Sequence, residues 1–199
     1  MSGDVDGLIM HSDGKARCWW CGDDEQYMQY HDEEWGIPIY DDGDLFELLN
    51  LEGAQAGLSW ITILRKRENY RQAFDHFDPE KIARYDETKI SELLNNPGIV
   101  RNKLKVNAVV TNAKVFLDMQ QAGESFSDYI WSFVDGKVIN NRLKTRKDIR
   151  ATTPESDAIS KALKKRGFKF IGSTVCYAFM QSAGLVNDHL IGCHCHEKC

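Results

Sequence analysis

The sequence has no long hydrophobic run, no internal repeat and no low-complexity tract. No apolar segment approaches the roughly 20 residues that a membrane-spanning helix needs. Residues 1–15 also lack the apolar core of a secretory signal peptide. These absences argue against a membrane or secreted protein, so we expect a cytoplasmic protein with no membrane partner.

The sequence also has no convincing segment in which polar and apolar residues alternate, and only residues 137–139 read as a stray extended piece. Apolar residues recur instead at the helical spacing of three and four. Between Asn102 and Gln121 they form one continuous stripe. The pattern predicts an all-α fold, with helices over residues 44–55, 59–74, 88–94, 102–121, 127–133, 153–167 and 173–183 and a short one opening at Asp78-Pro79.

Composition indicates one domain. A chain of 199 residues can bury a substantial core. Its hydrophobic fraction of 42% and charged fraction of 28% are typical of a soluble globular protein. Residues 1–16 are polar and rich in glycine and aspartate, so we expect a disordered leader there and a single globular domain over residues 17–199. We expect this domain to be a monomer.

The formal net charge of −5 argues against nucleic acid as a partner, but the distribution of charge matters more than its sum. Positive residues gather at 101–105, 142–150 and 161–169. An acidic protein with one basic face can still hold a phosphate backbone. Solvated surface is the alternative interpretation of each single cluster.

Cysteines gather near the two ends of the chain, in the company of histidines. In a cytosolic protein this clustering favours a metal over disulfides. Zinc takes four cysteine or histidine ligands in a tetrahedron, and two from each end would join the ends. Cys18 and His31 with His189 and Cys193 would serve, and so would Cys18 and Cys21 with Cys193 and Cys195. Free thiols beside a surface His-rich tail are the alternative.

One carboxylate stands among small and apolar residues in the segment from Leu51 to Trp60. On a helix Glu52 shares a face with Gln55, and its apolar neighbours predict burial. A buried carboxylate is costly unless donors or a cation satisfy it. A flat cationic ligand stacked on Trp60 would meet that need. The alternative is that Glu52 faces water or pairs with Arg65.

Aromatic residues lie among acidic ones in the segment before residue 36. Aromatic side chains usually belong to a core. Tyr27, Tyr30 and Trp35, however, interleave with the acidic residues 32–34, which predicts a partly exposed aromatic wall. Such walls stack bases and bind cations.

The segment from Leu163 to Thr174 reads as a basic helix end, a turn bounded by glycines and the apolar start of a second helix. Glycines allow close approach of the backbone, and N–H groups at the start of a helix can hold a phosphate. The signal is modest on its own, because such corners between helices are common.

These segments together resemble the 3-methyladenine DNA glycosylase I family, the constitutive bacterial branch of the helix-hairpin-helix glycosylases. The resemblance spans residues 17–195 and is carried by residues 30–36 (YHDEEWG), 51–60 (LEGAQAGLSW), 65–70 (RKRENY), 160–171 (SKALKKRGFKFI) and 184–192 (GLVNDHLIG). It implies a helix-hairpin-helix fold in which two lobes flank a base pocket. It also implies hydrolysis of the N-glycosidic bond of 3-methyladenine in alkylated double-stranded DNA, without lyase activity, with free 3-methyladenine as a product.

The resemblance further implies roles for single residues. The metal is one structural zinc, held by Cys18, His31, His189 and Cys193 and not by Cys21, Cys195 or Cys199. Glu52 hydrogen-bonds the alkylated adenine, Trp60 stacks on it, and Tyr27, Tyr30 and Trp35 line the pocket. The DNA-binding hairpin uses Lys165, Gly167, Lys169, Gly172 and Ser173. Residues 98–106 (GIVRNKLKV) resemble a helix start found across the superfamily.

The chain departs from the wider superfamily after this hairpin. Most members carry there, in a Val-Asp-x-His pattern, an aspartate that drives cleavage of the glycosidic bond, whereas Asn187 takes its position here. A 3-methylated nucleotide is cationic, so its base leaves neutral, and the enzyme need only flip the nucleotide, recognise the base and admit water. The alternative is that the neighbouring Asp188 supplies the charge.

Two other classes of protein compete with this interpretation. A non-catalytic, zinc-stapled DNA-binding module would keep the hairpin and the metal but would have no need of Glu52. A thiol oxidoreductase could use Cys18 and Cys21 as a redox pair. Such pairs follow a strand in a βαβ fold, which the helical pattern does not provide.

Overall fold

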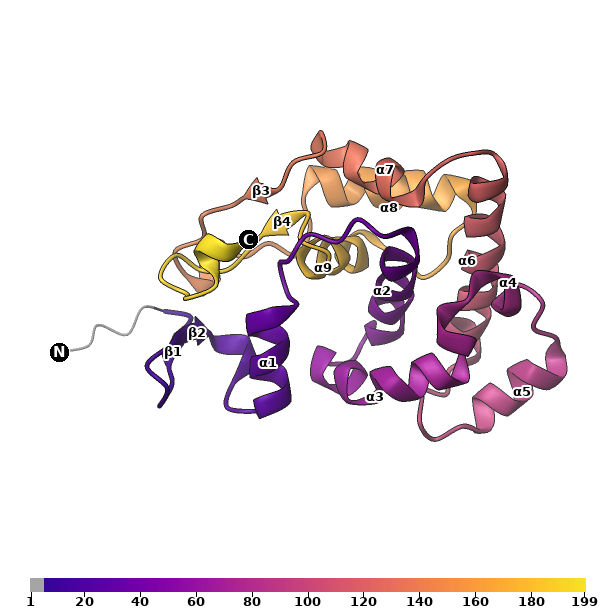
Figure 1. Cartoon of the computed structure of the whole chain (residues 1–199), viewed down its shortest axis with the longest axis horizontal. Helices are drawn as coiled ribbons and strands as arrows, with labels where there is room; N and C mark the ends of the chain where they lie inside the picture. Colours follow the sequence, from indigo (N-terminus) through magenta and orange to yellow (C-terminus); the bar gives the residue numbers. More distant parts are fainter. Residues whose placement is uncertain (1–5) are drawn as a thin grey trace.

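The structure, a computed structural model, describes residues 6–199. Most of these residues are helical, as the sequence predicts, and the strands form only two short pairs (Figure 1). The α-helices are α1 (Glu25–Glu33), α2 (Asp42–Gln55), α3 (Trp60–Ala73), α4 (Pro79–Ile82), α5 (Glu87–Asn95), α6 (Lys103–Gln121), α7 (Phe126–Trp131), α8 (Pro154–Arg166) and α9 (Ser173–Ser182). Short 3-10 helices are η1 (Trp19–Cys21), η2 (Asp75–Phe77), η3 (Ser132–Val134), η4 (Arg146–Asp148) and η5 (His196–Lys198). Within the described range no helix is long and apolar enough to cross a membrane.

Helix boundaries follow the capping residues. Most expected helices agree with those found to within two residues at each end, and α1 is the helix that the apolar pattern did not predict. Side-chain oxygens accept hydrogen bonds from first-turn N–H groups, which have no partner inside a helix. These caps are Asp24, Asp41, Asp78, Asp86, Asn102, Ser125 and Thr153.

One of the two strand pairs is a local hairpin, and the other joins distant parts of the chain. β1 (Leu8–Met10) pairs antiparallel with β2 (Ala16–Cys18), and β3 (Ile139–Asn140) pairs parallel with β4 (Val186–Asn187). The extended piece expected at residues 137–139 therefore overlaps β3.

The β1–β2 hairpin corrects the expectation of a disordered leader for residues 6–16; residues 1–5 lie outside the described range. The physical reason is that the polar side chains bond within the protein. The buried guanidinium of Arg17 donates to the carboxylates of both Asp13 and Asp32, at 2.7 and 2.8 Å for its Nη2 atom. The amide of Trp19 donates to the carbonyl of Gly7 at 2.9 Å.

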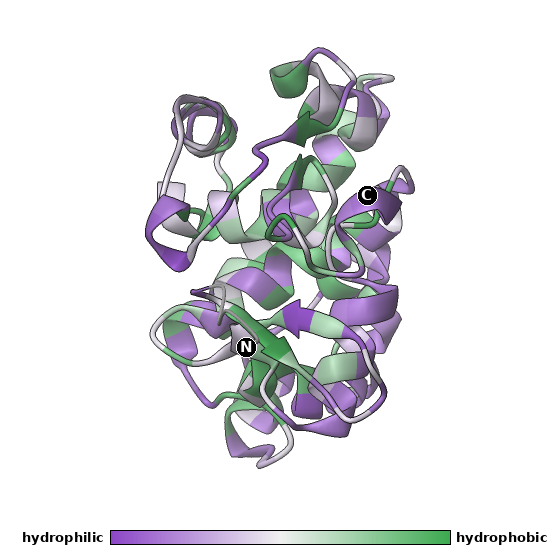
Figure 2. Cartoon of the chain, turned by 90° about the vertical axis from the view of Figure 1, so that its left-hand side faces the viewer, coloured by the Kyte–Doolittle hydropathy of each residue, from purple (hydrophilic) through white to green (hydrophobic). Residues whose placement is uncertain are grey.

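The core lies where α2, α6, α8 and α9 meet. α9 packs against α2 and α8, and α6 packs against α2, α4 and α5. A run of fully buried rings joins α2, α6, α7 and the turn after α8, with neighbouring centroids 4.8–5.7 Å apart; the rings are Phe46, Phe116, Phe126 and Phe168. In Figure 2 hydrophobic and hydrophilic residues alternate around the helices, as amphipathic helices on a shared core require.

A buried amide network fixes the turn between α8 and α9. Asn112 of α6 accepts from the amide of Lys169 at 2.7 Å and donates to its carbonyl at 3.2 Å. The same Asn112 donates to Asn50 of α2 at 2.9 Å. Each buried polar group finds a partner, so the network orients the turn at little cost.

A close backbone approach follows α9. Gly184 has a φ of +71°, and a Cβ there would lie 2.4 Å from the backbone nitrogen of Pro38. Only glycine fits both the conformation and the space. The contact brings the last part of the chain beside the segment that follows α1.

Candidate functional site

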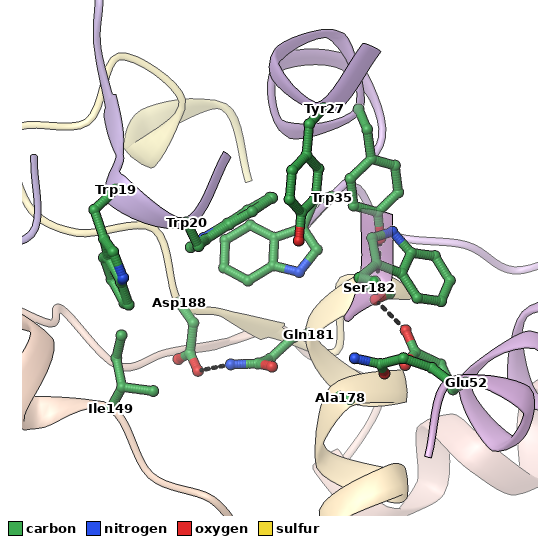
Figure 3. A pocket seen from close by; sticks show the side chains of 13 residues that line it. Trp19, Trp20, Tyr27, Trp35, Glu52, Ile149, Ala178, Gln181, Ser182 and Asp188 are labelled. Atoms are coloured by element: carbon green, nitrogen blue, oxygen red, sulfur yellow. Dashed lines mark hydrogen bonds between the residues drawn. The ribbon is translucent and has the colours of Figure 1, made fainter. Parts of the chain in front are cut away.

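A cavity of about 220 Å³ opens between α1, α2, α9 and the chain ends (Figure 3). It holds every residue that the sequence assigned to a base pocket. Its lining is Trp19, Trp20, Tyr27, Tyr30, Trp35, Glu52, Gln55, Trp60, Ile149, Ala178, Gln181, Ser182 and Asp188. The cavity has aromatic rings along its walls and a carboxyl group at each end, from Glu52 and Asp188. This lining suits a flat ligand with polar edges.

Glu52 lies 2% exposed in the wall of this cavity. Its Oε1 accepts a hydrogen bond from the hydroxyl of Ser182 at 2.6 Å, and Tyr30 donates to that hydroxyl at 3.1 Å. Its Oε2 is buried and has no partner within the described residues. Arg65, the alternative partner, bonds Asp24 instead. Glu52 therefore presents one bonded and one open oxygen.

Burial raises the pKa of Glu52 to about 8, and the hydrogen bond from Ser182 opposes this rise only in part. No cation contributes to the shift. At neutral pH the empty pocket therefore holds mostly the neutral acid. A ligand that donates to Oε2 or carries positive charge will favour the ionised form.

The end of α2 is built for close contacts. Lys105 of α6 donates to the carbonyls of Ala54 and Ala56 at 2.8 and 2.6 Å, which satisfies carbonyls that lack a partner inside the helix. On the opposite side, a Cβ on Gly53 would lie 3.2 Å from the carbonyl oxygen of Phe170. The small residues around Glu52 thus let the α8–α9 turn lie directly beside the pocket.

The aromatic wall comes from η1, α1, the turn after α1 and the start of α3. Trp20 lies with its ring centroid 4.8 Å from that of Trp35 and 5.0 Å from that of Tyr27. Tyr30 lies 5.5 Å from Trp60. The indole nitrogen of Trp60 is buried without a partner in the described part of the chain. The pocket therefore has ring faces for stacking and a free donor near Glu52.

Asp188 occupies the other end of the cavity and is 2% exposed (Figure 3). Its carboxylate accepts from Asn141 at 2.6 Å, from Tyr177 at 2.6 Å and from Gln181 at 2.8 Å. Asn187, by contrast, faces away from the cavity, donating to the carbonyl of His196 and accepting from the amide of His189. Asn187 takes the position of the superfamily's aspartate, but the carboxylate that lines this pocket belongs to the next residue, Asp188.

Several lining residues escaped the sequence argument. Ser182 and Gln181 sit on α9, an apolar helix whose polar positions are the available signal. Trp19 and Trp20 belong to the aromatic segment before residue 36, and Ile149 belongs to the basic segment 142–150. Neither segment has a residue spacing that predicts which side chains line a pocket.

Four potential metal ligands converge where the chain ends meet. The ligand atoms of Cys18, His31, His189 and Cys193 all lie within 4.8 Å of one another, and all four residues are buried. Cys193 Sγ lies 3.5 Å from both His31 Nε2 and His189 Nδ1. Residue spacing in the sequence allowed two ligand sets, and the structure brings together the one with two cysteines and two histidines.

The other cysteines lie outside this set. The thiol of Cys21 donates to the carbonyl of Cys18, and burial raises its pKa to about 12, so it is a poor ligand. Cys195 belongs to a second cluster with His31, Asp32 and His194.

Second contacts orient both imidazoles. His31 Nδ1 lies 2.8 Å from Asp32, and His189 Nε2 lies 3.1 Å from the carbonyl of Trp35. Burial lowers the pKa of His189 to about 3, which leaves its Nδ1 free to ligate. The rings also pack on the aromatic wall, since His189 lies 4.7 Å from the ring of Trp35. The Cys/His cluster therefore packs against the aromatic wall of the pocket.

The α8–α9 turn presents the residues expected to contact DNA. Lys165 and Lys169 are exposed, and Gly167 has a φ of +108° where α8 ends. Gly172 begins α9 without a side-chain cap, so the first N–H groups of α9 are open to a ligand. The hydroxyl of Ser173 is already engaged with Ser156 and Asp157, which leaves its backbone as the available donor.

Glu52 should make stability fall as pH rises. Its carboxyl has a higher pKa in the folded protein than in the unfolded chain, so the unfolded state gains by ionising between about pH 4.5 and pH 8. We expect the unfolding free energy of the wild type to fall relative to that of Glu52→Gln across this window, by up to about 1.4 kcal/mol per pH unit. Denaturant unfolding of both proteins at several pH values measures this, and parallel curves would contradict the buried neutral acid.

Comparison with known proteins agrees with this geometry. The family model for methyladenine glycosylase matches residues 20–196. DNA-3-methyladenine glycosylase 1 of Escherichia coli (strain K12) is 52% identical over 180 residues, which cover 90% of this chain and 96% of that protein. DNA-3-methyladenine glycosylase of Haemophilus influenzae is 54% identical over 180 residues, covering 90% and 97%.

Solved structures agree as well. A crystal structure of 3-methyladenine DNA glycosylase I superposes with a TM-score of 0.89 at 54% identity, covering 90% of this chain and 99% of that chain. The enzyme of Staphylococcus aureus, solved to explain its recognition of 3-methyladenine, gives a TM-score of 0.84 at 41% identity, covering 86% and 92%. The chain therefore belongs to the methyladenine glycosylase family.

Proposed function

We propose that this protein hydrolyses the N-glycosidic bond of 3-methyladenine in alkylated double-stranded DNA and releases the free base. The observation that carries the proposal is the open Oε2 of Glu52 in an aromatic cavity beside a basic helical turn. A relative of 41% sequence identity has been solved in complex with 3-methyladenine. The chemistry of the pocket suits the same base.

Recognition follows from the groups in the pocket. The exocyclic amine of 3-methyladenine donates to Glu52 Oε2, while Ser182 keeps Oε1 occupied and the carboxyl fixed. Stacking on Trp60 and Tyr30 contributes about 1–3 kcal/mol per base. Guanine does not offer an amine at the same place. The cationic charge of the methylated nucleotide also favours ionised Glu52, which a neutral adenine does less.

Cleavage needs little further assistance. The methylated base leaves as a neutral molecule, so flipping the nucleotide and admitting water are the remaining tasks. Among the described residues that line the pocket none carries an amine, and a lyase would need one to form a Schiff base. We therefore propose a monofunctional glycosylase.

Asp188 gives the mechanism a second candidate. It lines the cavity whereas Asn187 is used to hold the chain end, so any carboxylate that stabilises positive charge on the sugar is Asp188. Its three donors already satisfy much of its capacity as an acceptor. We assign recognition to Glu52 and a lesser, electrostatic part to Asp188.

Glu52→Gln should slow release of 3-methyladenine about 10- to 100-fold, because a hydrogen bond to a charged group contributes about 1.5–3 kcal/mol. Chromatography of bases released from methylated DNA measures the rate. Glu92→Gln, an exposed position on α5, serves as the matched control and should match the wild type. A wild-type rate for Glu52→Gln beside no activity for Asp188→Asn would reverse the two roles. No base release by the wild type would favour the non-catalytic DNA-binding module.

We also propose that the buried Cys/His cluster holds one structural zinc ion. Zinc bonds of about 2.0–2.3 Å place neighbouring ligand atoms of a tetrahedron about 3.3–3.8 Å apart. The distances here are 3.5 Å for two sulfur–nitrogen pairs and 3.8 Å for Cys18 Sγ to His189 Nδ1. Four protein ligands leave no position for water, so the ion would supply stability and no chemistry.

The Cys18→Ala variant should lose zinc, and its free energy of unfolding should fall by several kcal/mol, because the free energy of metal binding at such a site contributes directly to folding. Cys21→Ala is the matched control, three residues away, equally buried and outside the cluster. Elemental analysis and thermal unfolding of both variants provide the readout. Loss of zinc from Cys21→Ala as well would select the other ligand set, and retention of zinc by Cys18→Ala would contradict both sets.

The turn between α8 and α9 is proposed as the DNA-binding hairpin of the helix-hairpin-helix type. The turn carries exposed Lys165 and Lys169, and the first N–H groups of α9 that follow it have no side-chain cap. Such groups bind phosphates and fix the register of DNA without reading sequence. The buried Asn112 holds the turn in the required shape.

Changing Lys165 and Lys169 together to Glu should weaken DNA binding equally for all sequences. It should also reduce the slope of log affinity against log salt by about 2, since each lost phosphate contact removes about 0.9. Lys81 and Lys89, on α4 and α5, changed in the same way, provide the control. Fluorescence anisotropy over a salt series measures both, and an unchanged slope would place the DNA elsewhere.

A further inference from the structure

A second basic feature lies in the loop between β3 and α8. A recess of about 520 Å³ is lined there by Arg142, Lys144, Lys147 and Arg150, with Asn141, Leu143, Asp148 and Tyr177 completing its walls. Four positive side chains therefore face one hollow, in a protein whose formal net charge is −5. Grouping like charges costs energy unless a counter-charge is bound.

Four cations face a single carboxylate, that of Asp148, in the lining of this recess. All four residues are exposed, and none of their side chains forms an ion pair or hydrogen bond within residues 6–199. Asp148, the one carboxylate in the lining of the recess, accepts hydrogen bonds from the backbone of its own loop. Its Oδ2 accepts from the amides of Lys144 and Thr145 at 3.0 and 2.8 Å. The recess therefore presents an unbalanced positive charge.

The loop is held in place rather than free. Leu143 is buried in a small core with Leu190, Cys18 and the cysteines near the chain end. The carbonyl of Leu143 accepts from the amide of Ile191 at 2.7 Å, and the amide of Asn141 donates to Asn187 at 3.3 Å. These contacts attach the basic loop to the segment that carries the metal-ligand cluster.

The recess shares a wall with the base pocket. Asn141 and Tyr177 line the recess, and both donate to Asp188, which lines the pocket. Ile149 lies between Lys147 and Arg150 in the sequence and lines the pocket opposite Trp19. Figure 3 places Ile149 and Asp188 at the end of the pocket away from Glu52. The α8–α9 turn lies at the Glu52 end, through the contact of Phe170 with Gly53.

We infer that the recess formed by residues 142–150 binds a backbone phosphate of the DNA that carries the flipped nucleotide, at the end of the pocket opposite the α8–α9 turn. The inference rests on the proposed function, which places DNA across the mouth of the pocket. A phosphodiester fits the recess because it is anionic and the loop supplies guanidinium and ammonium donors. Two anchors on either side of one pocket hold the backbone while a single nucleotide leaves the stack.

The test compares two double variants, Lys144→Ala with Lys147→Ala and, as a control in the distant α4–α5 region, Lys81→Ala with Lys89→Ala. The probe is a labelled duplex that carries a stable abasic-site analogue. Anisotropy over a salt series should give the recess variant roughly tenfold weaker binding and a shallower salt slope, and the control neither. Binding of free 3-methyladenine should remain at the wild-type level, which shows that the variant is folded.

A scan with neutral methylphosphonates identifies the phosphate. Replacing the phosphates of the duplex one at a time should reveal two sensitive groups in the wild type. In the recess variant one group should lose its sensitivity, while the other group, held by Lys165 and Lys169, keeps it. Wild-type affinity, or weaker binding with both groups still sensitive, would overturn the inference. Release of 3-methyladenine by the wild type reports on the proposed function separately.

Discussion

Contacts between the first and last parts of the chain position both the Cys/His cluster and the pocket. Cys18 and His31 come from the first part of the chain, and His189 and Cys193 come from the last. The same segments carry the aromatic wall and Asp188. Since Trp35 packs against the ring of His189 and its carbonyl faces the other imidazole nitrogen, a change at the joined ends is transmitted to the pocket.

The pocket is assembled from elements that are far apart in sequence. Glu52 is supplied by α2, Ser182 by α9 and Tyr30 by α1, and a single chain of hydrogen bonds links the three. The packing of α9 against α2 brings the hydroxyl to the carboxyl. The geometry of the site therefore depends on the packing of the core, because a shift of α9 would break the hydrogen bond from Ser182 that orients Glu52.

Local signals in the sequence were enough to predict much of this. Helical periodicity and capping residues located most helices, and the small residues beside Glu52 indicated a buried carboxylate with close backbone neighbours. The choice between Asn187 and Asp188 depends on a direction that spacing does not contain. Asn187 ends strand β4 and donates to the carbonyl of His196, whereas Asp188 follows the strand and lines the cavity. The order of residues 6–16 was also not predicted, because Lys15 pairs with Asp32, which lies beyond the local sequence.

The neutral form of Glu52 weakens the attraction of the empty pocket for small cations. Aromatic rings around an ionised carboxylate would make a general trap for cations, including metal ions and polyamines, which are abundant wherever DNA is found. Because burial favours the neutral form of Glu52 in the empty pocket, such ions gain less beside it than beside an ionised carboxylate. Charge develops only when a ligand of the right shape excludes water and offers a donor. In the proposed mechanism, binding of a cationic base at neutral pH is therefore linked to release of a proton from Glu52.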